Sequence, residues 1–138
     1  MIKPGLTNEK TWLVDKQHLA SSFGSGLVDV LATPMLVGFC EETARTAVDP
    51  FLPEDQKTVG TSVRLRHLAA TPPGMKVTIR AKLIEVDGRR LHFQIEAWDE
   101  EERIGEAEHE RFIIDVERFE RRMAEKRRKV ALRRDSNV

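Results

Sequence analysis

The sequence predicts an α+β protein, in which one long helix packs across a curved antiparallel sheet of about five strands. Two observations lead to this prediction. The hydrophobic period is helical shortly before Pro53, and after Pro53 it becomes alternating. Clean alternation is typical of antiparallel strands that have one covered face. The length of 138 residues fits a single domain with one core, over residues 1–138.

A strand and then the long helix are expected in the first part of the chain. The strand covers about residues 6–14. Thr33 followed by Pro34 predicts an N-cap and the first position of a helix. An Asp-Pro pair then ends the helical period, so the helix is predicted over residues 34–48.

Four more strands follow, at about residues 58–70, 75–86, 91–98 and 104–116. An Asp-Gly pair between the second and third of these predicts a tight hairpin. In the first of the four, alternation places six residues on one face: Val59, Thr61, Val63, Leu65, His67 and Ala69. A histidine therefore shares the apolar face of this strand, while two arginines take the other face.

The last part of the chain, residues 117–138, is predicted to be a charged helix and tail. Val116, Phe119 and Met123 have helical spacing, so the first part is expected to dock on the body. The basic end, KRRKVALRRDSNV, is expected to be frayed and solvated rather than to bind nucleic acid.

The composition excludes several classes of protein. Basic and acidic residues number 23 each, so net charge offers no case for binding nucleic acid or a membrane. Cys40 is the single cysteine, so an intrachain disulfide and a cysteine-based zinc site are both excluded. The N-terminus has no signal-peptide core, no run is long and apolar enough to span a bilayer, and a cytoplasmic protein is expected. None of the histidines has metal-ligand spacing, so no metal is predicted.

Two side chains stand out as candidates for chemistry. His67 is either a structural histidine bonded to backbone or a proton-transfer group held on the covered face of the sheet. Glu41 lies on the border of the apolar helix face, whereas Glu42 falls on the polar side. Glu41 is then either an edge residue or a carboxylate that burial turns into a base or nucleophile.

Thr33 adds a third candidate and suggests a dimer. N-capping alone explains a threonine here, but a helix N-terminus also stabilises an oxyanion that forms on a carbonyl. Thr33 and Glu41 are eight residues apart, which is roughly 12 Å along a helix. Two antiparallel copies of the helix would bring the N-terminus of one chain near Glu41 of the other. The sequence therefore suggests a site shared across a homodimer interface.

Four stretches resemble the hotdog-fold thioesterases, and most closely the fluoroacetyl-CoA thioesterase-like group. They read LATPMLVGFCEETA, VGTSVRLRHLAATPPGMKVTI, VDGRRLHFQIEAWD and IGEAEHERFIIDVERF. The resemblance implies the hotdog fold and a homodimer, or a higher assembly, with sites between the subunits. It also implies a catalytic set of Thr33, Glu41 and His67, with Gly60 lining the pocket beside them.

The activity that the resemblance implies is hydrolysis of a short or small acyl-CoA thioester. Glu41 would attack the carbonyl or activate water, His67 would assist proton transfer, and Thr33 would polarise the carbonyl oxygen. No cofactor is implied, because coenzyme A is part of the substrate. Gly24 and Leu27 stand near positions where aromatic residues help to close the pocket of the fluoroacetyl-specific enzyme, so another short acyl group is expected as much as fluoroacetyl.

Two other functions remain open at this point. The first is a hotdog dimer that binds an acyl thioester or a small apolar ligand without turning it over. The second is another hotdog enzyme such as a dehydratase, for which the sequence has no independent histidine-aspartate motif. Thiol release distinguishes the thioesterase from both.

Overall fold

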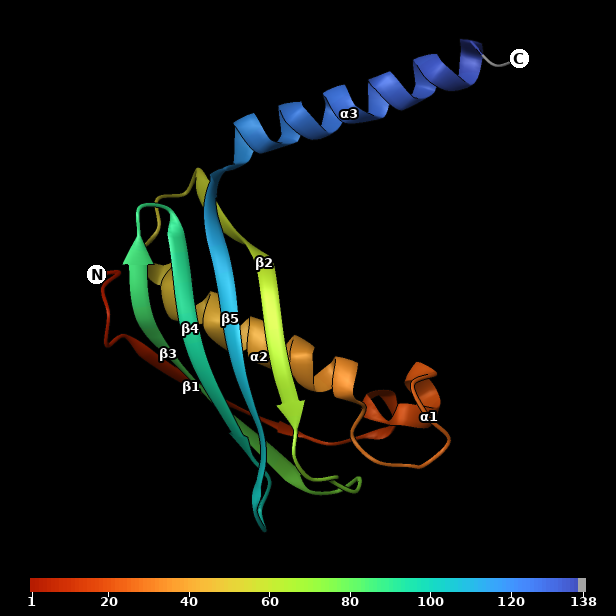
Figure 1. Cartoon of the computed structure of the whole chain (residues 1–138). Coiled ribbons are helices and arrows are strands. Elements are labelled where there is room, and N and C mark those ends of the chain that lie inside the picture. Colours follow the sequence, from red (N-terminus) through yellow and green to blue (C-terminus); the bar gives the residue numbers. More distant parts are fainter. Residues whose placement is uncertain (137–138) are drawn as a thin grey trace.

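A computed structural model describes residues 1–136, and it contains one antiparallel sheet crossed by one long helix (Figure 1). The strands are β1 (Thr7–Leu13), β2 (Gln56–His67), β3 (Lys76–Asp87), β4 (Arg90–Trp98) and β5 (Arg103–Asp115). Their order in the sheet is β1-β3-β4-β5-β2, so β1 and β2 are the two edges. The predicted five-strand α+β architecture is confirmed.

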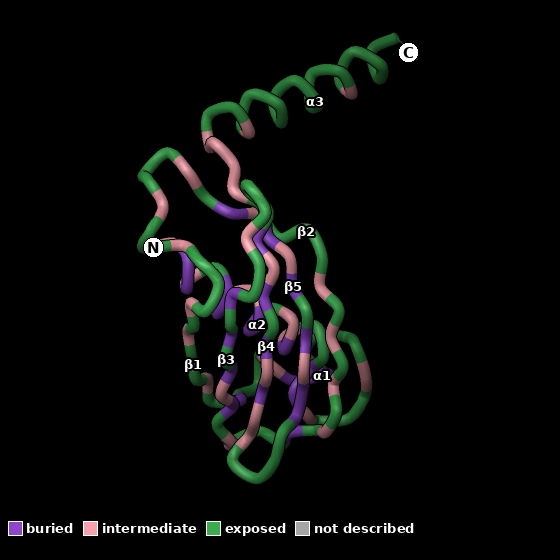
Figure 2. Tube along the Cα trace, turned by 60° about the vertical axis from the view of Figure 1, so that its left-hand side comes forward, coloured by how far each residue is buried: buried purple, intermediate pink, exposed green. Residues whose placement is uncertain are grey.

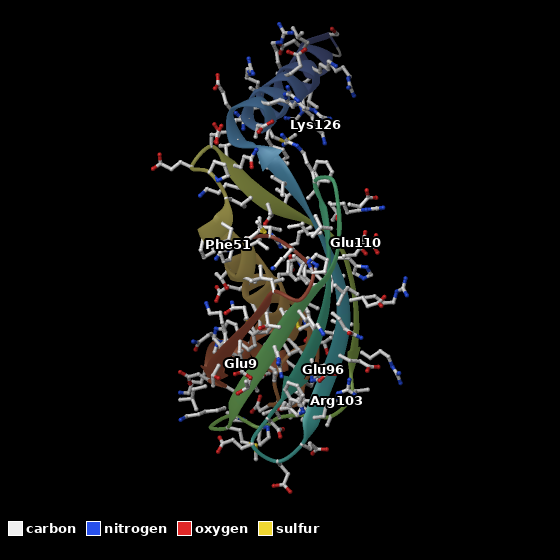
Figure 3. All side chains as sticks on the ribbon, turned by 90° about the vertical axis from the view of Figure 1, so that its left-hand side faces the viewer. Glu9, Phe51, Glu96, Arg103, Glu110 and Lys126 are labelled. Carbon is white, nitrogen blue, oxygen red and sulfur yellow. The ribbon has the colours of Figure 1, made fainter. Side chains whose placement is uncertain are left out.

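The helix α2 (Thr33–Val48) lies across one face of the curved sheet, and the core forms between them (Figure 3). The central strands supply alternate residues that are at most 1% exposed: Val77, Ile79, Ala81, Leu83, Leu91, Phe93, Ile95 and Ala97. Figure 2 shows buried residues alternating with others along these strands. Burying one such aliphatic or aromatic side chain stabilises the fold by about 1.5–3 kcal/mol, so the alternation holds the sheet against the helix.

The buried face of α2 is wide. Leu36, Cys40, Ala44 and Val48 are buried at helical spacing, Phe39 and Thr43 are buried beside them, and Val37 is only half-buried. Phe39 stacks on Trp12 of β1, with ring centroids 4.3 Å apart. The hydroxyl of Thr43 donates to the carbonyl of Phe39 at 2.8 Å, which satisfies a polar group inside the core.

A bulge in β2 changes the faces that simple alternation predicts. Gly60 pairs with Arg111 and Ser62 with Glu110, so Thr61 is the additional residue. Thr58 and Gly60 therefore face α2 before the bulge, and Val63, Leu65 and His67 face it afterwards. The prediction for His67 is right, but the predictions for Val59 and Thr61 are wrong, because an inserted residue inverts the alternation.

Three short helices complete the chain before β2: η1 (Lys16–His18), α1 (Ala20–Phe23) and η2 (Asp49–Phe51). A loop joins α1 to α2, and it carries two highly exposed apolar side chains, Leu27 at 98% and Val28 at 68%. Among residues 1–136, no helix is both long enough and apolar enough to cross a membrane.

The C-terminal helix α3 (Val116–Ser136) continues from β5 and projects away from the sheet (Figure 1). None of its residues is buried, so the expectation that its first part docks is wrong for this single chain. The helix continues to Ser136, so the expected fraying is also wrong up to that residue. Asn137 and Val138, the last two residues of the predicted tail, lie outside the described residues.

Candidate active site

Thr33 and His67 meet where α2 begins and β2 ends. The threonine hydroxyl and the histidine Nδ1 are 2.7 Å apart, which is hydrogen-bond distance. Thr33 is the first residue of α2, and Ala32 occupies the N-cap position with an extended ψ of 138° and no side-chain bond. The prediction that Thr33 is the N-cap is therefore wrong, because its hydroxyl bonds to the histidine and not to the helix backbone.

The second ring nitrogen of His67, Nε2, is buried and has no hydrogen-bond partner among residues 1–136. Burial lowers the pKa of His67 below its ordinary value. The ring is therefore neutral near pH 7, with one nitrogen bonded to Thr33 and the other without a partner among residues 1–136.

An open pocket of about 340 Å³ lies over this pair. Its lining combines the segment that precedes α2 with the segment that follows β2: Ala20, Ser25, Val30, Leu31, Leu68, Ala69 and Ala70. His67 is the only titratable group in that lining. The pocket therefore suits a small, mostly apolar group beside the hydroxyl and the imidazole.

Glu41 lies two turns further along α2, in a different cluster. Its Oε2 is 3.9 Å from Nη1 of Arg111, and its side chain is 41% exposed. Gly60 of β2 lies against the carboxylate: a Cβ built on Gly60 would be 3.0 Å from that Oε2. A side chain at Gly60 would thus compete with Glu41 for space.

The base of this cluster is a buried arginine and a buried histidine on β5. Arg111, 5% exposed, donates from Nε to the Thr58 hydroxyl at 2.8 Å and from Nη2 to the Thr58 carbonyl at 3.0 Å. Its Nη1 lies 3.2 Å from Nε2 of His109, and His109 Nδ1 lies 2.8 Å from the carbonyl of Ser62. Nε2 therefore accepts while Nδ1 donates, so His109 is neutral, and burial accordingly lowers its pKa.

The buried Arg111 charge faces Glu41 and holds that carboxylate in place. Burial lowers the pKa of Arg111, and the negative charge of Glu41 opposes the shift. His109 and Arg111 are not among the site residues predicted from the sequence. A charged residue inside an otherwise apolar alternation, Gly105-Ala107-His109-Arg111, is the signal that would have found them.

The structure thus joins the predicted residues in two pairs. Thr33 lies with His67, and Glu41 lies with Gly60. Among residues 1–136, Glu41 makes no hydrogen bond or ion pair with Thr33 or His67, and two turns of helix separate them, roughly 12 Å. One chain by itself does not bring the three catalytic candidates together.

Three other side chains that could carry chemistry have structural roles. His18 accepts from the backbone N–H of Asp15 and packs edge-on against Phe39. Burial raises the pKa of Cys40 to about 12, so its thiol is not a nucleophile near neutral pH. Asp99 accepts from the backbone of its own turn and from Thr71. Within residues 1–136, no group of three or more His, Cys, Asp or Glu side chains is arranged to hold a metal ion.

Comparisons with known proteins relate this geometry to one enzyme class. The family described as fluoroacetyl-CoA-specific thioesterase matches residues 14–117. A fluoroacetyl-CoA thioesterase from Streptantibioticus cattleyicolor is 39% identical over 98 residues, which cover 71% of this chain and 70% of that protein.

Solved structures show the same fold. A structure of the fluoroacetyl-CoA thioesterase superposes with a TM-score of 0.86 at 30% identity, covering 91% of this chain and 98% of that one. A Thermus thermophilus protein described as a thioesterase superfamily member superposes with a TM-score of 0.89 at 27% identity, covering 96% and 98%.

Proposed function

Because this chain belongs to the family of fluoroacetyl-CoA-specific thioesterases, we propose that it hydrolyses a short acyl-CoA to the free acid and coenzyme A. The family makes the chain a thioester hydrolase. The observation that carries the assignment of the site is the Thr33–His67 hydrogen bond at the N-terminus of α2, with the second histidine nitrogen free. The pocket above this pair accepts the acyl group and its carbonyl.

The carbonyl oxygen of the thioester points toward the hydroxyl and the backbone N–H of Thr33, because Pro34 has no N–H and the N–H groups of Met35 and Leu36 donate to the Ala32 carbonyl. These donors and the positive end of the helix dipole stabilise the negative charge that develops on this oxygen. In one route Glu41 takes a proton from the attacking water, and neutral His67 relays this proton from Glu41 to the departing sulfur, so coenzyme A leaves as a thiol. In the other route Glu41 attacks the carbonyl carbon and coenzyme A leaves as a thiolate; water then hydrolyses the acyl–Glu41 anhydride, and His67 passes the proton that this water loses to the thiolate. Both routes consume one water and leave the new oxygen on the acid.

The site is shared by two subunits, because Glu41 and the Thr33–His67 pair are too far apart in one chain. β2 is an edge of the sheet, and its outer side pairs with no other strand among residues 1–136. On α2, a Cβ built on Gly38 meets nothing within 4 Å, so a second helix has room to approach there. A twofold axis beside β2 that makes the two α2 helices antiparallel brings Glu41 of one chain toward the pair of the other.

The acyl group is short, and the pocket does not select for fluorine. The loop in front of the pocket carries its apolar side chains outward: Phe23 is 52% exposed and Leu27 is 98% exposed. Neither side chain closes over the pocket, although Leu27 stands near one of the positions where the resemblance implies an aromatic residue that helps to close it. We therefore expect several short acyl groups to be accepted with similar efficiency.

The first experiment measures thiol release from short, branched and aromatic acyl-CoAs. Glu41→Ala is compared with Glu42→Ala, a matched control one position away whose carboxylate bonds to Lys10 at 2.7 Å. We expect Glu41→Ala to lower kcat by about 100-fold or more, and Glu42→Ala to stay within a few-fold of the wild type. Absence of thiol release from every substrate would refute the function, and normal turnover in Glu41→Ala would refute the role of this residue.

Mixed dimers test the shared site. Glu41→Ala and His67→Ala subunits are each inactive, but a mixed dimer has one site in which all three residues are intact. Equal mixing should therefore restore about a quarter of the wild-type activity, because half of the dimers are mixed and each has one intact site of two. If all three residues came from one chain, no mixture of the two variants would recover activity.

A further inference from the structure

The helix α3 holds most of the unbalanced positive charge of the chain. It contains nine of the 23 basic residues and four of the 23 acidic ones, so it carries a net charge of +5. The rest of the chain therefore carries −5, and the overall neutrality hides two parts of opposite sign. Separation of charge on this scale favours the encounter of α3 with an anion.

Five of these cations form one row along the helix, here called the basic row: Arg118, Arg122, Lys126, Lys129 and Arg133. Their spacing of four, four, three and four residues places them on one face of α3. All five are exposed, and the first four line a groove along the helix. Figure 3 shows Lys126 on α3, away from the sheet.

The basic row is not neutralised by the chain's own carboxylates. Within residues 1–136, Arg128 is the one cation of α3 with an ion pair, to Glu125, and it lies outside the row. By contrast, the arginines on the outer face of the sheet have acidic partners: Arg64, Arg66 and Arg103 each lie within 4.0 Å of a carboxylate. The basic row therefore remains available to an external anion.

The thioester substrate is such an anion, and the pocket offers its phosphates no partner. Coenzyme A joins its thiol to a nucleotide through a long arm, and the nucleotide end carries the phosphate charges. The pocket over Thr33 and His67 is lined by no lysine or arginine, and the body around it has net negative charge. A neighbouring positive surface is needed to offset that repulsion.

The twofold arrangement of the proposed function places the basic row near that pocket. The first residue of α3, Val116, donates its backbone N–H to Asp55 at 2.9 Å, next to the start of β2. His67 is the last residue of β2. Antiparallel packing of two β2 edges brings the start of one strand beside the end of the other, so the base of α3 lies near the partner's pocket.

The direction and length of α3 agree with this placement. In Figure 1, α3 extends past the β2 edge, on the side of the sheet opposite β1. Its 21 residues span about 30 Å, which is long enough to follow an extended nucleotide arm outside the pocket. We propose that the basic row of one subunit binds the phosphates of the acyl-CoA held in the pocket of its partner, an inference that rests on the proposed function.

The test compares two substrates with the same acyl group. One is the acyl-CoA, and the other is the acyl-pantetheine, which has the thioester but no phosphates. The variant K126Q/K129Q removes two cations of the row, and R127Q/R134Q is the matched control, because it removes two cations from the opposite face of α3.

For K126Q/K129Q we expect KM for acyl-CoA to rise about five- to tenfold with kcat unchanged, and no change with acyl-pantetheine. The control should stay within twofold on both substrates. Added salt should raise KM of the wild type for acyl-CoA only. Equal effects on both substrates, or equal effects of both variants, would overturn the proposal. The proposal would also be overturned if the variant lost activity only on acyl groups attached to an acidic carrier protein, because that protein would then be the partner of the basic row.

Mixed dimers show which subunit supplies the row. The intact site of the mixed dimer uses the pocket of the Glu41→Ala subunit. K126Q/K129Q on the His67→Ala subunit should therefore raise KM, and the same change on the Glu41→Ala subunit should not. The reverse result would overturn the proposal. If the wild type hydrolyses neither substrate, the proposed function fails, and calorimetry of coenzyme A binding to the same variants still tests the row.

Discussion

Replacing Gly60 with alanine tests whether the position of Glu41 controls the reaction. The new Cβ would lie 3.0 Å from Glu41 Oε2, 3.3 Å from Arg111 Nη1 and 3.3 Å from His109 Cε1. Gly60 does not have a positive φ, so alanine fits its backbone and the contacts alone decide the effect. Arg111 and His109 are buried and hydrogen-bonded, whereas the Glu41 side chain is partly exposed and is the one free to move.

The magnitude follows from the overlap. A carbon–oxygen distance of 3.0 Å is a few tenths of an ångström shorter than an ordinary contact, so the carboxylate must move by about that much or more. A misplacement of about 1 Å costs about 100-fold in rate, so we expect kcat/KM to fall about tenfold, or about 1.4 kcal/mol. Stability should change by less than about 1 kcal/mol, because alanine restricts the unfolded chain and thereby offsets part of the strain.

The assay is thiol release by Gly60→Ala at pH 7, with the free energy of unfolding measured in urea on the same samples. Gly105→Ala is a structural comparison, since its Cβ would press on Leu36 and the backbone of Arg66 but not on Glu41. Wild-type turnover in Gly60→Ala would refute the reasoning. So would a loss of activity that only accompanies unfolding.

Three further results are expected. Thr33→Val should lower kcat at least tenfold but leave the melting temperature within about 2 °C, because Ala32 is the N-cap; a loss of about 1 kcal/mol of stability would show that Thr33 caps the helix after all. His67 and His109 both have lowered pKa values, so the stability they contribute is complete above their ordinary pKa and declines as the pH falls through the lowered values. Urea unfolding from pH 8 to pH 5 should show this decline below about pH 6.5, and H67Q/H109Q should reduce it; stability that rises on acidification would contradict both shifts. Gly38→Leu fills the open side of α2, so sedimentation should show folded monomers without activity, whereas active dimers would exclude this face from the interface.

The sequence predicts the central strands and the helix well, because burial imposes a period there. Every second residue of β3 and β4 must reach the core, so Ile79 or Phe93 can be recognised from its neighbours alone. The packing of the helix against β1 cannot be predicted from neighbouring residues. Phe39 is buried because Trp12 stacks on it from a strand 27 residues earlier in the sequence.

The candidate site, like the fold, is predicted only in part by the sequence. The residues Thr33, Glu41 and His67 were identified from local pattern and from resemblance to a family, and the inward direction of His67 follows from alternation. The sequence does not predict which residues of β2 before Ser62 face the helix. The bulge at Thr61 depends on the register of β2 against β5, and the register is set only in the folded sheet.

What the sequence by itself determined is therefore the set of elements, the core of the central strands and the family. Only the tertiary structure decided what each polar side chain meets. In the folded chain the Thr33 hydroxyl bonds to His67 and does not cap the helix, and Arg111 lies beside Glu41. The physical reason is range: periodic burial and turn preference act between near neighbours, whereas hydrogen bonds and ion pairs in a site join segments that only the folded chain brings together.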